Sequence, residues 1–207
     1  MAVQHASAAR SARAPRTHLH RTASASASAS AVPTRVTAGG AALATARIAL
    51  GAVFLWAFAD KTFGLGYSTT DGRAWIDGAS PAKGFLSHVA AGPLRGTFHA
   101  MAGQAWADWL FMLGLLGIGL ALAGGVALRI AAAGGTVLLA LMWAAEWPPA
   151  RHLADGTASG STNPLLDYHV VYALLLIALA VTGAGRTWGL ARRWAALPVV
   201  RDHAWLR

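Results

Sequence analysis

Six ionisable side chains stand where long apolar stretches of the chain begin or end: Asp60, Lys61, Asp108, Glu146, Asp167 and His169. Glu146 directly follows one uninterrupted apolar stretch, and His169 lies inside another. Lys61 could neutralise Glu146 or Asp167, and His169 could donate a proton or a hydrogen bond to a ligand carbonyl. Their types and positions make Lys61, Glu146 and His169 hypothetical catalytic residues.

Aromatic residues fall at the same ends of the apolar stretches. Together with two of the acids they form the set of candidate ligand-binding residues, which are Asp60, Trp106, Trp109, Trp143, Trp147, Asp167, Tyr168 and Tyr172. A second interpretation stays open, because tryptophan and tyrosine also form belts at membrane interfaces and charges at helix ends are often only solvated. The functional interpretation needs the stretches to be helices that bring these residues together.

The elements that would position these side chains are four apolar stretches, at about 40–59, 108–128, 130–147 and 167–184. The chain has 207 residues, of which 56% are hydrophobic and 12% charged, whereas soluble domains carry about 25% charged residues. A helix of about 20 apolar residues crosses the hydrocarbon of a bilayer. We therefore expect an all-α membrane protein, with four transmembrane helices in an antiparallel bundle over residues 40–186.

Three further regions surround this expected bundle. Residues 1–39 are basic and rich in Ala and Ser, which predicts a disordered tail. In the long loop after the first span, Ser80-Pro81 and Pro93-Leu94 predict two short helices that cap a cavity or shield helix ends. Residues 187–207 combine tryptophan with arginine, including Arg192 and Arg193, and are expected to lie in the cytoplasmic interface.

The distribution of charge predicts the orientation. The net charge is +9, and the side with both termini and the turn at Arg129 would hold 12 cations and one acid, against five cations and seven acids opposite. Basic flanks favour the cytoplasm, so both termini are expected there, and the basic residues need no nucleic-acid partner. Arg47 is expected to reach the interface, a lipid phosphate or a partner subunit. A signal peptide cleaved after Ala57-Phe58-Ala59 is the competing interpretation of the first stretch.

The sequence lacks the residues that several kinds of chemistry require. The absence of cysteine excludes disulfides, thiolate zinc, iron–sulfur clusters and covalently bound haem within the chain. Dinucleotide, P-loop and serine-hydrolase fingerprints are missing. A buried haem would need two axial histidines at membrane depth, and His169 is the only histidine clearly within a span. No spacing of His, Asp and Glu predicts a metal site. No metal and no covalently bound cofactor are therefore expected.

Small residues recur on one face of the second stretch, at Gly117, Ala121 and Gly125. This spacing permits close approach of two helices. Packing inside the bundle and a homodimer interface both remain open.

The residues Arg47–Gly51 with Phe54, the closing Asp60-Lys61 pair and the Gly-rich second stretch resemble the DoxX family. The stretches 58–68, 106–120, 146–149 and 163–175 are similar to an actinobacterial branch of it, and the resemblance covers about residues 42–205. It implies a four-helix protein of the bacterial inner membrane, related to a subunit of thiosulfate:quinone oxidoreductase. Some members are linked instead to redox-stress complexes with soluble partners.

The functional expectation combines this resemblance with the polar and aromatic residues. We expect a membrane subunit that assists quinone-linked redox chemistry together with a partner redox subunit or a soluble protein, rather than a stand-alone enzyme. Quinone is the expected ligand, and membrane lipid is the expected surrounding partner. The alternative is a non-catalytic scaffold or assembly factor for a redox-stress complex. A small-solute transporter is a third interpretation, disfavoured by the small number of spans.

Overall fold

A computed structural model describes residues 36–206 of the chain. The chain divides into two units, residues 1–34 and 35–207, and every described residue belongs to the second. The disordered tail expected at residues 1–39 therefore lies outside the described residues except for its last four positions. Over residues 36–206 the structure contains helices and one isolated bridge between His152 and Ala158, but no strand.

Three helices are long and apolar enough to cross a membrane: α1 (Ala38–Phe63), α4 (Ala105–Gly124) and α5 (Leu128–Glu146). A fourth apolar helix, α6 (Tyr168–Val181), has 14 residues. These four helices fall on the four predicted stretches. All four leave many large apolar side chains exposed, including Val53, Leu113, Val137 and Leu174, as expected for helices that face lipid.

The ends of the helices differ from the expected ones by a few residues, because glycine and capping residues set them. The Thr37 hydroxyl accepts a hydrogen bond from the Gly40 amide and starts α1 earlier than expected. Gly125, with a φ of 67°, takes the left-handed conformation that ends α4, so this helix stops before residue 128. Gly183 has the same conformation, with a φ of 64°, just beyond α6.

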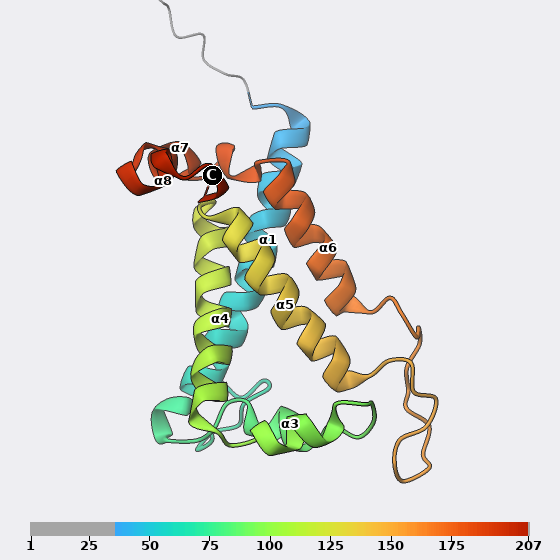
Figure 1. Cartoon of the computed structure of the whole chain (residues 1–207). Helices are drawn as coiled ribbons and strands as arrows, with labels where there is room; N and C mark the ends of the chain where they lie inside the picture. Colours follow the sequence, from blue (N-terminus) through green and yellow to red (C-terminus); the bar gives the residue numbers. More distant parts are fainter. Residues whose placement is uncertain (1–35, 207) are drawn as a thin grey trace, which may run out of the picture. The chain divides into compact units, whose positions relative to one another are not determined.

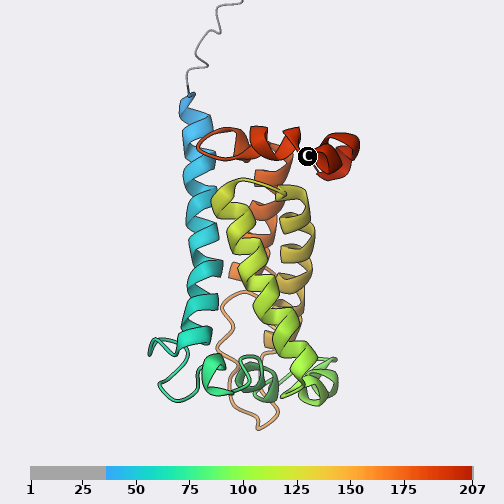
Figure 2. The ribbon, with the colours of Figure 1, turned by 90° about the vertical axis from the view of Figure 1, so that its left-hand side faces the viewer.

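The long helices pack side by side in the order α1, α4, α5 and α6 (Figures 1 and 2). Gly51 of α1 and Gly119 of α4 lie at the closest approach of these two helices, where an added Cβ would overlap the neighbouring helix. Of the predicted series, Gly117 has no neighbour at its Cβ position, whereas Gly125 lies against the Arg47 side chain of α1 and the Gly185 backbone. The shared core includes Phe54, Met112, Leu122, Leu139 and Leu176.

The loop between α1 and α4, residues 64–104, carries the two predicted short helices, α2 (Lys83–Ser87) and α3 (Arg95–Met101), and one turn of 3-10 helix, η1 (Trp75–Asp77). In both views these elements lie at one end of the long helices (Figures 1 and 2). Leu86 and Phe98 pack with Ala145 of α5 in a second apolar core. The loop therefore covers the last turn of α5.

The C-terminal segment, residues 182–206, lies at the opposite end of the long helices (Figure 2). It contains η2 (Ala184–Arg186), α7 (Ala191–Ala196), α8 (Pro198–Asp202) and η3 (Ala204–Leu206). Pro198 interrupts the helix as expected and occupies the first position of α8. The Leu190 amide donates to the Gly124 carbonyl at the end of α4, with an N···O distance of 2.8 Å.

Candidate functional site

Two of the predicted acids hold the first loop in place. Asp60 is 1% exposed and accepts hydrogen bonds from the amides of Tyr67 and Ser68 and from the Ser68 hydroxyl, at 2.6–3.2 Å. Asp108 accepts from the Ser80 hydroxyl at 2.8 Å and the Ala82 amide at 2.9 Å. The Ser80 hydroxyl thus donates to Asp108 and does not cap α2, whose N-cap position is Ala82. Both carboxylates fix the backbone of a loop.

Lys61 lies apart from the acids that it was expected to neutralise. Its ammonium nitrogen is 5.9 Å from the ring centroid of Phe111 on α4. Throughout residues 36–206 no lysine or arginine forms an ion pair with Glu146 or Asp167. The reason is the helix order: α1 packs mainly on α4, whereas these two acids belong to the α5–α6 pair.

The residues of α5 and α6 form the one group of predicted site residues whose polar atoms converge. Asp167 is the N-cap of α6, and its Oδ1 accepts a hydrogen bond from the Val170 amide at 3.2 Å. This capping geometry fixes the start of α6, including the next two residues, Tyr168 and His169. Glu146 is the last residue of α5. Because α5 and α6 pack along each other, residues 21 or more positions apart come together.

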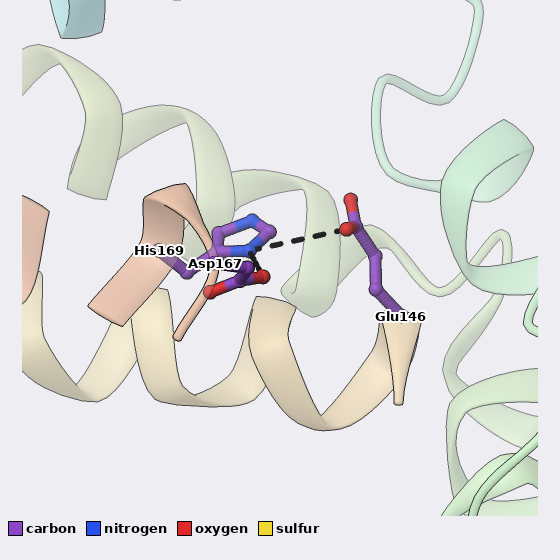
Figure 3. Close-up of side chains that lie close together, drawn as sticks. All are labelled: Glu146, Asp167 and His169. Atoms are coloured by element: carbon purple, nitrogen blue, oxygen red, sulfur yellow. Dashed lines mark hydrogen bonds and ion pairs between the residues drawn. The ribbon is translucent and has the colours of Figure 1, made fainter. Parts of the chain in front are cut away.

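We call Glu146, Asp167, Tyr168 and His169 the α5–α6 cluster, and Figure 3 shows Glu146, Asp167 and His169. The Nδ1 atom of His169 is 2.8 Å from Oδ2 of Asp167 and 4.0 Å from Oε2 of Glu146. The Tyr168 hydroxyl donates to Oε1 of Glu146 at 2.9 Å. His169 is 1% exposed, whereas the Glu146 side chain is 38% exposed. The cluster therefore joins a buried imidazole to a carboxylate that solvent can reach.

The neighbouring carboxylate determines the state of the His169 ring. An ionised carboxylate only accepts hydrogen bonds, so Nδ1 must donate to Asp167. In the neutral ring the other nitrogen, Nε2, is then an acceptor. This atom is buried and has no hydrogen-bond partner, and the same is true of the Trp143 indole nitrogen one turn before Glu146. Two buried polar atoms at this end of the helix pair thus have no hydrogen-bond partner among the described residues.

The cluster also has the composition of a metal site. One ligand atom each from Glu146, Asp167 and His169 lies within 4.8 Å of the other two. Imidazole and carboxylate together suit divalent cations such as zinc or manganese. The sequence does not predict this grouping, because Glu146 comes from a different helix and its spacing from Asp167 and His169 along the chain gives no signal.

The predicted aromatic residues divide between the cluster and the surface. Tyr168 packs on the His169 ring, with centroids 4.0 Å apart, and Tyr172 lies 6.0 Å from Tyr168. Trp143 and Trp147 meet edge to face at 5.6 Å. Trp106 and Trp109 are more than half exposed on α4, far along the chain from the cluster. Tyr168 is therefore the predicted aromatic residue that hydrogen-bonds to a cluster acid.

Arg47 is fully buried, and its contacts are within the chain. Its guanidinium donates to the carbonyls of Leu122 and Ala123 at the end of α4 and of Thr187 and Trp188 in the C-terminal segment. The expected contact with lipid or a partner is not available to a side chain that is 0% exposed. Arg47 instead joins α1, α4 and the C-terminal segment.

The remaining predicted contact residues, Arg192 and Arg193, are exposed on α7. They stand beside exposed apolar side chains of the same segment, such as Trp188 and Leu190. This surface fits the expected interfacial position.

Comparisons of the chain with protein-family models, with curated proteins and with solved structures found no match. The DoxX resemblance therefore stays a prediction, and the candidate site is defined by its own geometry.

Proposed function

We propose that the protein is a multi-pass membrane subunit of DoxX type that binds a quinone-like ligand at the α5–α6 cluster. The observation that carries this proposal is the buried Nε2 atom of His169, which has no partner while Nδ1 donates to Asp167. A quinol hydroxyl is a donor of the kind this nitrogen lacks. The cluster lies at the end of two apolar helices, where a ligand dissolved in the bilayer would meet polar groups.

The chemistry follows from the two bonds of the imidazole. When a quinol is oxidised it releases two electrons and two protons. Nε2 of His169 takes one proton, and the Asp167 carboxylate stabilises the imidazolium that forms. Glu146 is the more exposed of the two carboxylates beside the ring and carries the second proton toward water. The two electrons pass to a partner redox subunit. In the thiosulfate:quinone oxidoreductase that the resemblance implies, the same steps run in reverse, with electrons from a sulfur substrate reducing the quinone and His169 and Glu146 supplying the protons.

The proposed topology has four spans, an antiparallel arrangement and both termini in the cytoplasm of a bacterial inner membrane. The distribution of basic residues supports it. α6 is short for a span, and short spans are accommodated by local thinning of the bilayer. The packing of α6 along α5 supports its inclusion.

The lack of cysteine allows a direct test of this topology, because a single introduced cysteine is the only thiol in the chain. In intact cells a membrane-impermeant maleimide should label Ser161→Cys, in the loop between α5 and α6, and should not label His203→Cys in the C-terminal segment. Both positions are exposed. The opposite labelling pattern would overturn the orientation, and equal labelling of both would overturn the four spans.

The ligand is tested by extracting the lipids of protein purified from native membrane and by titrating decylubiquinol into the full chain. We expect co-purifying quinone, and a loss of affinity of about tenfold or more in Glu146→Ala and His169→Ala, since each removes a charged or buried polar contact. His152→Ala, at an exposed position outside the cluster, is the matched control. No quinone in the extract, together with unchanged affinity in both cluster variants, would reject the proposal.

A second candidate function is a non-catalytic scaffold, which the exposed C-terminal segment favours. Trp188, Leu190, Val199 and Trp205 are 50–66% exposed there beside Arg192 and Arg193. Exposed apolar and basic side chains together suit a protein partner or an anionic lipid surface. A partner that is retained by His169→Ala but lost by the paired change Arg192→Glu and Arg193→Glu would favour this function over ligand binding.

A further inference from the structure

An apolar cavity lies between the first loop and the helices α4 and α5. Its volume is about 90 Å³, and its lining residues are all Ala, Phe, Leu, Met or Trp. Leu86 of α2 and Phe98 of α3 form the cover, and α4 and α5 form the other walls. The short helices of the first loop thus cap a cavity, which is one of the two roles predicted for them.

The cavity is bordered by the outward-facing surface of the helices. Three of its wall residues, Trp106, Leu110 and Leu141, are 55%, 66% and 42% exposed. Their positions on α4 and α5 place them on helices that are long and apolar enough to cross a membrane. A hydrocarbon chain could therefore enter between these side chains from the bilayer without passing through water.

Size and lining limit the ligand to a slender apolar group. An apolar cavity of about 150 Å³ stays dry and binds benzene. A cavity of about 90 Å³ suits a section of a chain rather than a substituted ring. A polar head would find no hydrogen-bond partner there, and its burial would be costly.

On α5, a residue that lines the cavity and a residue of the cluster lie one helix turn apart. Met142 lines the cavity, and Glu146 is four residues later on α5, so the two side chains are neighbours along one helix face. Ala145, between them, packs against the short helices of the first loop. A ligand whose head reaches Glu146 and His169 could thus place the start of its chain in the cavity.

We propose that this cavity binds the hydrocarbon chain of an amphipathic ligand whose polar head lies at the α5–α6 cluster. The position of the head rests on the proposed function, whereas the chain site rests on the cavity itself. If the cavity binds the hydrocarbon chain, the affinity should depend on the presence of that chain. Binding at the cluster alone would not produce this dependence.

The test uses the protein of residues 1–207 in phosphatidylcholine nanodiscs. The two probes are decylubiquinone and its counterpart without a hydrocarbon chain, 2,3-dimethoxy-5-methyl-1,4-benzoquinone. Leu110→Trp enlarges an exposed wall residue so that it fills the cavity. Leu113→Trp is the matched control, because Leu113 is an equally apolar, 55% exposed residue of α4 outside the cavity lining. We expect Leu110→Trp to lower the affinity for decylubiquinone about tenfold, which is the contribution of roughly two buried methylene groups. The affinity for the probe without a hydrocarbon chain should change less than twofold.

The outcomes separate the two proposals. An unchanged decylubiquinone affinity in Leu110→Trp, or an equal loss in Leu113→Trp, would overturn the chain site even if His169→Ala abolished binding of both probes. A loss in Leu110→Trp combined with no effect of His169→Ala would support the chain site and overturn the placement of the head, because the cavity would then take the chain of any lipid.

Discussion

The acids of the α1–α4 pair and those of the α5–α6 pair look alike in the sequence but have different surroundings in the structure. Asp60 and Asp108 stand at the end and start of apolar helices, as Glu146 and Asp167 do. The first two accept hydrogen bonds from loop amides and from the hydroxyls of Ser68 and Ser80. The other two face a buried imidazole.

The comparison teaches that burial of a polar group does not by itself identify a site. Asp60 and His169 are both 1% exposed. The Asp60 oxygens have three donors from the loop that follows α1, which occupy most of the acceptor positions of a carboxylate. His169 keeps one ring nitrogen without a partner. Accounting for every donor and acceptor separates an acid that holds a loop from a residue that can bind.

The largest expected effect is on the structural side of the comparison. Asp60→Ala should lower the free energy of unfolding by about 3 kcal/mol, because it removes three hydrogen bonds to a buried charged group. This corresponds to a fall of roughly 6–12 °C in Tm, measured by circular dichroism in detergent. Decylubiquinol affinity per folded molecule should stay within twofold. A loss of affinity without a loss of stability would place Asp60 in the binding site.

The sequence predicted the helices better than it predicted the contacts of their polar ends. Apolar length alone located α1, α4, α5 and α6, and proline located α2, α3 and the break before α8. What could not be predicted was which helix lies beside which. That order decides that Lys61 lies against Phe111 instead of pairing with Glu146, and that Arg47 is buried against backbone carbonyls.

On the binding side, Asp167→Asn is expected to have the next largest effect. Asparagine is as good an N-cap as aspartate, so α6 should keep its start and Tm should change by less than about 2 °C. The carboxylate that makes Nδ1 the donor is lost, so Nε2 is no longer fixed as the acceptor, and decylubiquinol affinity should fall about tenfold. Titration calorimetry measures this loss. An unchanged affinity with a lowered Tm would make Asp167 a capping residue only, like the structural acids.

Ser80→Ala tests the structural side more gently. It removes the hydroxyl that donates to Asp108 but keeps the donation from the Ala82 amide. A loss of about 1 kcal/mol in the free energy of unfolding is expected, again with ligand affinity unchanged. Asp108→Asn measured in parallel should cost at least as much. If neither variant lowered Tm, the assignment of Asp108 to the loop would be wrong.

Tyr168→Phe should give the smallest change and sharpens the binding side. It removes the hydroxyl that donates to Oε1 of Glu146 while keeping the aromatic ring that packs on His169. Affinity for decylubiquinol should fall about threefold, the size of a partly exposed hydrogen bond. Tyr172→Phe is the control, because its hydroxyl makes no hydrogen bond to either cluster acid. Equal effects of both changes would mean that the hydroxyl of Tyr168 does not position Glu146.

The account is tested most directly by the nitrogen signals of His169 in protein labelled with ¹⁵N histidine. The chain has eight histidines, and comparison with His169→Ala assigns the signals of this one. The account predicts that decylubiquinol shifts the Nε2 signal, as this atom gains a donor, while the Nδ1 signal stays that of a nitrogen donating to Asp167. Spectra in which saturating decylubiquinol leaves the Nε2 signal unchanged would contradict it.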